Sequence, residues 1–209
     1  MEQMQAGQCR VGMVQTNCYG LMNKQTKEMI LIDPGDSPET IVAMVDRMQG
    51  KPVAVFLTHG HFDHILAVKE IKEKYGIPVY AGREEADVLA EVSLNKTDVM
   101  HRPISVYPDV LVDDLEELTM AGFSVQVLHT PGHTKGSVCY YFPEEKLLVS
   151  GDTLFRESVG RTDLPTGNTG QIIESVRRLI QMIPEDVDVL PGHESATTIG
   201  HEKRYNPFV

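Results

Sequence analysis

Four side chains that can bind a metal ion lie close together between residues 58 and 64. This run reads Thr-His-Gly-His-Phe-Asp-His, so it contains His59, His61, Asp63 and His64. Burying imidazoles and a carboxylate side by side without partners costs free energy, and a divalent cation is a partner that both kinds of group bind. The run therefore predicts a metal site.

The local sequence also indicates how these side chains are positioned. Residues 53–57 are an apolar run typical of a buried strand, which places the four side chains on the loop that leaves the strand end. Three more candidates follow predicted strands, in turns that contain glycine: His133, Asp152 and His193. Because loops at one edge of a sheet can converge, all of these side chains can meet at one site.

The number of donors decides how many ions such a site can hold. A zinc ion takes about four ligands, and a catalytic zinc ion often leaves one position for water. Seven donors are too many for one ion, but with one carboxylate shared they suit two ions about 3.5–4 Å apart. We therefore expect a binuclear centre.

The rest of the chain alternates predicted strands and helices. Strands are expected at residues 11–15, 19–22, 29–32, 53–57, 79–81, 123–129, 137–142, 146–150 and 187–190. Helices are expected after the N-cap Ser37 and over residues 65–75, 83–90 and 172–180. Hairpins in both halves favour two packed sheets with helices outside over one parallel sheet. Residues 93–108 are expected to form a loop or a lid.

The composition is that of an ordinary globular protein. Hydrophobic residues make up 41% and charged residues 23% of the 209 positions, and no Pro/Ser-rich linker interrupts them, so one domain over residues 1–209 is expected. The formal net charge of −11 argues against nucleic acid as the main partner. No apolar run is long enough for a membrane span, and the N-terminus lacks the apolar core of a signal peptide, so we expect a cytoplasmic protein.

The order of the candidate ligands resembles that of the metallo-β-lactamase superfamily, with His59-x-His61-x-Asp63-His64 followed by His133, Asp152 and His193. The resemblance implies a four-layer αββα sandwich of two mixed sheets, with a binuclear site at one edge. It also implies that one ion is bound by His59, His61 and His133 and the other by Asp63, His64 and His193, with Asp152 bridging. The expected ions are two divalent metals, zinc first, with iron or manganese as alternatives.

Two further segments are similar to the small bacterial glyoxalase II-like, or hydroxyacylglutathione hydrolase-like, enzymes: Gly151-Asp152-Thr153-Leu154-Phe155 and Gly160-Arg161-Thr162-Asp163. This resemblance implies a thioesterase that cleaves S-lactoylglutathione or a related acylthiol, with Asp63 and Asp152 positioning a metal-bridging hydroxide. It implies a small-molecule substrate and a monomer or homodimer. The C-terminal helical domain that grips glutathione in the larger enzymes is expected to be missing.

A few other residues are candidates beside a structural alternative. Arg161 is expected to hold a substrate carboxylate, or else to pair with Asp163, and Arg156 is a weaker candidate of the same kind. Asp33 either supports a metal-bound histidine or caps a turn. His129 is expected to be structural or to support a ligand.

Other functions remain open on the same ligands. A persulfide dioxygenase with one iron shares the Gly-Arg-Thr-Asp segment, and other enzymes of the superfamily cleave esters, lactones or phosphodiesters. A purely structural metal module is disfavoured because it needs no seven-donor arrangement. A class B1 β-lactamase would carry cysteine in place of Asp152.

Overall fold

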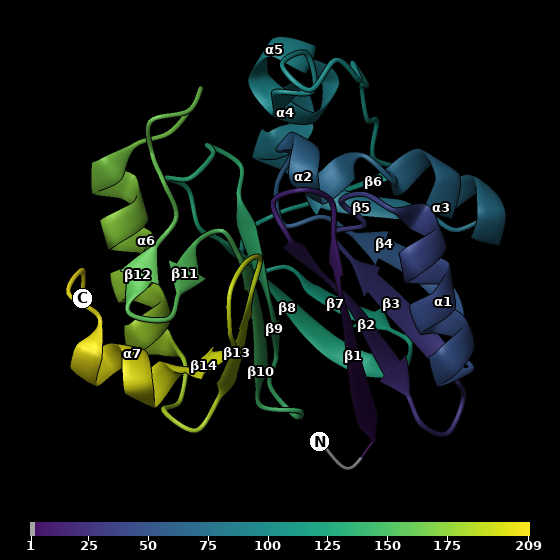
Figure 1. The fold of residues 1–209 in the computed structure, drawn as a ribbon. Helices are drawn as coiled ribbons and strands as arrows, with labels where there is room; N and C mark the ends of the chain where they lie inside the picture. The colour runs from purple at the N-terminus through teal and green to yellow at the C-terminus, as the bar shows by residue number, and fades with distance from the viewer. Residues whose placement is uncertain (1–2) are drawn as a thin grey trace.

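Two six-stranded β-sheets pack against each other and carry helices on their outer sides (Figure 1). Residues 3–209 are described by the computed structural model. The strand order is β1-β2-β3-β4-β5-β6 in the first sheet and β14-β13-β10-β9-β8-β7 in the second. Each sheet mixes parallel and antiparallel pairs. The αββα sandwich that the sequence predicts is thereby confirmed.

The first half of the chain forms the first sheet and the helices over it. Its strands are β1 (Met4–Val11), β2 (Thr16–Asn23), β3 (Glu28–Ile32), β4 (Lys51–Phe56), β5 (Val79–Gly82) and β6 (Val110–Val112). Its helices are α1 (Pro38–Met48), α2 (Phe62–Ile65), α3 (Val68–Tyr75), η1 (Arg83–Glu85), α4 (Ala86–Ala90) and α5 (Val92–Asn95). β1, β2 and β3 pair antiparallel, and β3 to β6 pair parallel.

The second half forms the second sheet. Its strands are β7 (Glu117–Met120), β8 (Phe123–His129), β9 (Val138–Phe142), β10 (Leu147–Gly151), β13 (Asp188–Pro191) and β14 (Thr197–Thr198). A small hairpin of β11 (Leu154–Phe155) and β12 (Ser158–Val159) precedes α6 (Thr169–Met182), and α7 (Ile199–Tyr205) ends the order. Figure 1 shows α1 and α3 on the side of the first sheet and α6 and α7 on the side of the second.

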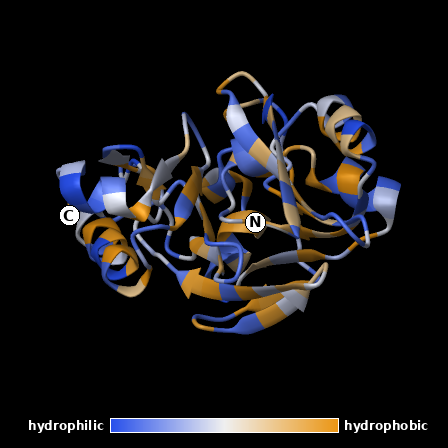
Figure 2. Cartoon of the chain, turned by 90° about the horizontal axis from the view of Figure 1, so that it is seen from below, coloured by the Kyte–Doolittle hydropathy of each residue, from blue (hydrophilic) through white to orange (hydrophobic). Residues whose placement is uncertain are grey.

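Three layers of apolar side chains hold this arrangement together. The central layer lies between the sheets and includes Phe56 of β4 and Tyr140 of β9, whose ring centroids are 4.8 Å apart. In the outer layers, amphipathic helices bury their apolar face against a sheet. Helix α6, for example, buries Ile172, Val176 and Leu179. Figure 2 shows the resulting alternation of hydrophobic and hydrophilic residues along the helices. The strand ends are thus anchored in a rigid core.

The structure corrects two local predictions. The strand expected at residues 11–15 is instead the end of β1 followed by a turn, because Gly12 and Gln15 have positive φ angles of 66° and 59°. Ser37 does not act as an N-cap, since its φ is 50° and its side chain caps no helix N–H. Pro38, whose fixed φ suits a first helical position, begins α1 without that cap.

The predicted loop at residues 93–108 contains the last residues of α5 and then an irregular segment. Buried Asn95 holds the segment in place, because its Nδ2 donates to the carbonyl oxygens of Leu89 and Ile104 at 3.1 and 3.0 Å. Across residues 3–209, no helix is both long and apolar enough to cross a bilayer.

Candidate metal centre

The turns that follow four strands of the two sheets bring the seven candidate ligands together. β4 leads to His59 and His61, β8 to His133, β10 to Asp152 and β13 to His193, while short helix α2 carries Asp63 and His64. The ligand atoms form three sets in which all atoms lie within 4.8 Å of one another: His59, His61 and His133; His59, His64 and Asp152; and Asp63, His64 and His193. The structure therefore places all seven predicted ligands at one site.

The first group consists of three buried imidazoles. His61 Nδ1 lies 2.8 Å from His133 Nε2, which in turn lies 3.2 Å from His59 Nε2. Each of these residues is at most 2% exposed. His133 Nδ1 donates to the carbonyl oxygen of Arg161 at 2.7 Å, so its Nε2 lone pair faces the other two rings. The three nitrogens form one face of a metal pocket.

The second group combines two imidazoles with a carboxylate. Asp63 Oδ2 is 3.4 Å from His64 Nε2 and 3.1 Å from His193 Nε2. Asp152 lies between the groups, because its Oδ2 is 3.6 Å from His133 Nε2 and 3.5 Å from His193 Nε2. Its other oxygen, Oδ1, is 3.4 Å from His64 Nε2. One carboxylate is therefore in reach of both groups, as the bridging role requires.

The donor set fits a bound cation. Among the candidate ligand atoms that face one another, His64 Nε2 and Asp152 Oδ1 are buried and have no hydrogen-bond partner within residues 3–209. Buried polar atoms without partners are costly, so an unpartnered cluster of this kind calls for a ligand. Imidazole nitrogens and carboxylate oxygens are the donors that zinc and iron accept. Each group offers three protein ligands and leaves a position for water or substrate.

The two groups differ in their electrostatics. Burial lowers the pKa of His59 well below its ordinary value and that of His61 to about 3, so both rings are neutral and ready to bind a metal. Burial acts in the same direction on His64, but the Asp63 and Asp152 carboxylates outweigh it and raise the pKa of that ring well above its ordinary value. The second group is thus the more negative environment.

Asp33 holds the candidate ligand His64 and the neighbouring Thr58 in place. Its carboxylate accepts hydrogen bonds from Thr58 N at 2.8 Å, from Thr58 Oγ1 at 2.7 Å and from His64 Nδ1 at 2.9 Å. The bond to Nδ1 leaves His64 Nε2 facing Asp63 and Asp152. Asp33 therefore supports a candidate ligand, which is one of the two roles expected for it.

Glu85 is a supporting residue that the sequence analysis missed. Its carboxylate is fully buried and accepts from Gly60 N at 2.7 Å, Thr134 Oγ1 at 2.8 Å and Gly136 N at 3.0 Å. It thereby ties together the loops that carry the three imidazoles of the first group. Burial raises the pKa of Glu85 to about 7, although the three hydrogen bonds oppose this shift. Residues 83–85 read Arg-Glu-Glu, which is typical of an exposed helix start, so no local signal in the sequence marks Glu85 as a buried residue.

Thr16 and Asn17 are further supporting residues without a sequence prediction. Thr16 Oγ1 donates to Asp63 Oδ2 at 2.8 Å. Asn17 Nδ2 donates to the carbonyl oxygens of Pro191 and Glu194 at 3.0 and 3.1 Å, and so holds the turn that carries His193. The signal in the sequence that could have identified them is that two polar residues begin β2, whose next residues are mostly apolar.

An open cavity of about 350 Å³ gives access to the candidate ligands. It is lined by Val14, His61, Phe62, Asp63, His133, Asp152, Phe155, Arg161, Leu164, His193 and Glu194. Arg161 thus borders the site, while its guanidinium makes a two-bond ion pair with Asp163, at 2.7 Å for each bond. Arg156 is not among the lining residues and lies 3.9 Å from Glu157. His129 has a structural contact, with Nε2 2.9 Å from the carbonyl oxygen of Lys135.

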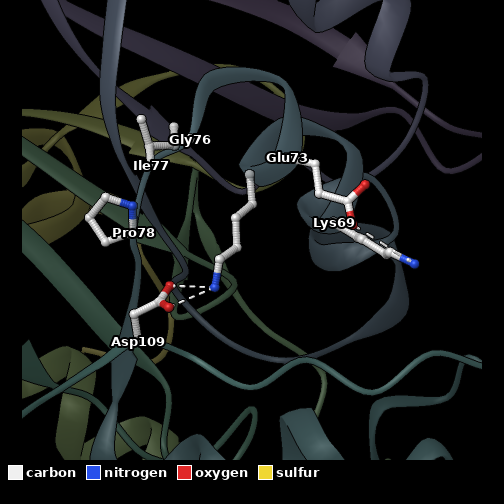
Figure 3. A pocket seen from close by; sticks show the side chains of 7 residues that line it. Lys69, Glu73, Gly76, Ile77, Pro78 and Asp109 are labelled. Atoms are coloured by element: carbon white, nitrogen blue, oxygen red, sulfur yellow. Dashed lines mark hydrogen bonds and ion pairs between the residues drawn. The ribbon is translucent and has the colours of Figure 1, made fainter.

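A larger hollow, of about 560 Å³, lies at the end of α3 (Figure 3). Lys72 and Asp109 form an ion pair in it at 2.7 Å, and Lys69 reaches Glu73 at 4.0 Å. These four charged side chains are at least one third exposed and satisfy one another. The hollow therefore lacks the buried, unpartnered donors that distinguish the smaller cavity.

Comparisons with known proteins agree with this geometry. The model of the metallo-beta-lactamase superfamily matches residues 11–193. The crystal structure of BLEG-1 B3 metallo-beta-lactamase is 40% identical, with a TM-score of 0.92 over 98% of this chain and 99% of that chain. TTHA1623, solved in a di-iron-bound form, is 37% identical, with a TM-score of 0.84 over 97% of this chain and 100% of that chain.

A relative with a stated activity is also similar over most of its length. Hydroxyacylglutathione hydrolase GloC of Haemophilus influenzae is 34% identical over 198 residues, which cover 93% of each chain. Both the family match and this relative extend across the turns that carry the seven candidate ligands. The chain belongs to the metallo-β-lactamase superfamily.

Proposed function

We propose that this protein is a binuclear metal-dependent hydrolase that cleaves the thioester bond of a small acylthiol, such as S-lactoylglutathione. The observation that carries the proposal is the position of Asp152, which reaches both ligand groups and lines the open cavity. The likeness to the GloC hydrolase supports the choice of a thioester.

The protein residues divide the work of the reaction. Two divalent cations at this site would supply a water deprotonated near neutral pH and would polarise the substrate carbonyl. Asp63, fixed by Thr16, is placed to orient that water against the carbonyl carbon. The thiol that leaves has a pKa of about 8.5, so the reaction needs no strong acid from the protein. This agrees with a cavity lining that contains carboxylates and imidazoles but no lysine or tyrosine.

Arg161 supports a substrate that carries a carboxylate. It borders the cavity, and its guanidinium presents five donors in a fork that suits a carboxylate. The two hydrogen bonds that Arg161 donates to Asp163 hold this fork in place, and both side chains remain more than 60% exposed. A carboxylate of the thiol carrier can therefore join the pair from solvent.

A second candidate is β-lactam hydrolysis, which the likeness to BLEG-1 favours. A third is oxidation of a persulfide at a single iron, for which the Gly160–Asp163 segment is the sequence argument. The three reactions differ in what they consume, because only the third takes up oxygen. They also differ in metal content, since the hydrolase proposal requires two ions per chain.

The test is metal analysis of the purified protein together with three assays. S-lactoylglutathione hydrolysis, hydrolysis of a chromogenic β-lactam, and oxygen uptake with glutathione persulfide are measured on the same metal-loaded sample. We expect two divalent ions per chain and the highest kcat/KM on the thioester. One iron per chain with oxygen uptake would overturn the proposal, and so would a β-lactam rate that exceeds the thioester rate.

A further inference from the structure

A second hollow adjoins the metal cavity and is of a different chemical character. It has a volume of about 230 Å³ and lies between the turn that joins β1 to β2, the start of α2, and the segment that contains Met100 and Arg102. Val14, Phe62 and Asp63 line both hollows. The groove is therefore next to the metal cavity, with these three side chains at the boundary.

The groove is lined mainly by apolar side chains. They are Met13, Val14, Phe62, Leu66 and Met100. Two of these side chains, Met13 and Val14, are 75% and 44% exposed. A set of this kind, gathered beside a polar site, is typical of a ligand-binding groove.

The charged groups in the groove lining already have partners. Arg102 Nη1 binds Asp36 Oδ2 at 2.9 Å, while Asp36 Oδ1 accepts from Ser37 N at 2.6 Å. Asp63 is held by Thr16. The groove therefore offers an occupant apolar contact area rather than an unpaired charge.

The part of the metal cavity that is not shared with the groove includes the charged residues Arg161 and Glu194, beside Phe155 and Leu164. A thioester whose carbonyl lies at Asp63 and Asp152 has two substituents that must leave the centre in different directions. A polar thiol carrier is compatible with the Arg161 side. An apolar substituent is compatible with the groove.

Resting on the proposed thioesterase function, we propose that the groove binds the acyl chain of the substrate. The substrate class is then a thioester of an apolar acyl group longer than acetyl, with its polar thiol carrier on the Arg161 side. The groove has room beyond the methyl group of a lactoyl unit. The protein thus selects substrates by the length and polarity of their acyl group.

The test is a series of glutathione thioesters that differ only in the acyl group: acetyl, lactoyl, butanoyl and hexanoyl. If the acyl chain enters the groove, kcat/KM rises roughly fourfold per added methylene, since each buried methylene favours the bound state by a constant amount. A kcat/KM that is flat or falls from acetyl to hexanoyl overturns the inference but leaves the thioesterase proposal intact. No turnover of any thioester by metal-loaded protein overturns both.

Variants locate the effect in the groove. Met100→Gln keeps the side-chain length but places an amide in the lining, so we expect the hexanoyl-to-acetyl ratio of kcat/KM to fall roughly fivefold. Met182→Gln is the matched control, because Met182 is a half-exposed methionine of α6, outside the groove. An equal fall in both variants, or in neither, contradicts the assignment. A higher rate with an apolar thiol than with glutathione would show that the groove binds the thiol side instead.

Discussion

The two halves of the candidate metal centre are built in different ways. The group of His59, His61 and His133 is almost fully buried and contains only imidazoles. The other group, of Asp63, His64 and His193, contains a carboxylate, and the side chains of Asp63 and His193 are 13% and 23% exposed. Packing therefore positions the side chains of the first group, whereas charge interactions at the edge of the cavity position those of the second.

Different supporting contacts follow from this difference. The first group depends on its backbone loops, which Glu85 ties together through Gly60, Thr134 and Gly136. The second depends on side chains that orient charged groups, as Thr16 does for Asp63 and Asp33 does for His64. Removing a contact from one side should therefore affect mainly the ion on that side.

The largest effect is expected when the link between the halves is removed. Asp152→Ala takes away the carboxylate that reaches His64, His133 and His193. We expect loss of at least one ion per chain and a fall in kcat/KM of more than about a hundredfold, beyond the 10–100-fold typical of a supporting residue. Metal analysis after gel filtration measures the first quantity and steady-state kinetics the second. Two retained ions with a normal rate would show that Asp152 does not bridge.

A smaller effect, confined to the first group, is expected from Glu85→Gln. The amide replaces one acceptor oxygen by a donor, so at least one bond to Gly60 N, Thr134 Oγ1 or Gly136 N is lost. We expect roughly tenfold weaker binding of one of the two ions. The free energy of unfolding should fall by about 1–3 kcal/mol. Titration against a chromophoric chelator separates the two binding steps.

Glu202 provides a matched control for this variant. It is equally buried and accepts from Glu157 N, Thr197 Oγ1 and Asn206 Nδ2 at 2.8, 2.5 and 2.9 Å, but it touches no candidate ligand. Glu202→Gln should lower stability to a similar extent and leave both metal affinities unchanged. Equal loss of metal binding in the two variants would mean that Glu85 acts only through global stability.

Thr16→Val should produce a weaker effect, confined to the second group. The substitution keeps the shape of the side chain and removes the hydrogen bond to Asp63 Oδ2. Loss of about 1 kcal/mol corresponds to roughly fivefold weaker binding of the second ion. Thr197→Val, which removes a comparable bond to Glu202, should leave metal binding unchanged. A weakening of both ions by Thr16→Val would contradict the separation of the two halves.

Arg161→Ala should leave both halves intact and is expected to have the smallest effect. If the guanidinium binds a substrate carboxylate from its exposed position, KM rises roughly threefold while kcat changes little. Arg83→Ala removes a similar exposed pair, with Asp113, outside the metal cavity, and should change neither constant. A loss of kcat without a change in KM would assign Arg161 a structural role. It would then act through its backbone carbonyl oxygen, which accepts the hydrogen bond from His133 Nδ1.

The candidate ligand residues could be predicted because their signals are local, whereas the αββα fold was predicted from the family resemblance. The His59-x-His61-x-Asp63-His64 run follows an apolar strand, and such spacing needs no long-range information. The strand predicted at residues 11–15 was wrong because a left-handed Gly12 ends β1, which apolar pattern alone does not reveal. The division of the ligands between two ions came from family resemblance rather than from spacing.

The sequence by itself therefore determined which side chains are candidate metal ligands and which strands lead to them. Only the tertiary structure decided what holds those side chains. Glu85 lies 49 residues from Thr134, and Thr16 lies 47 residues from Asp63, so these contacts leave no periodic or local trace. The apolar groove likewise forms only when the β1–β2 turn meets the segment around Met100. Ligand identity is a property of residue type, whereas orientation and access are properties of packing between distant segments.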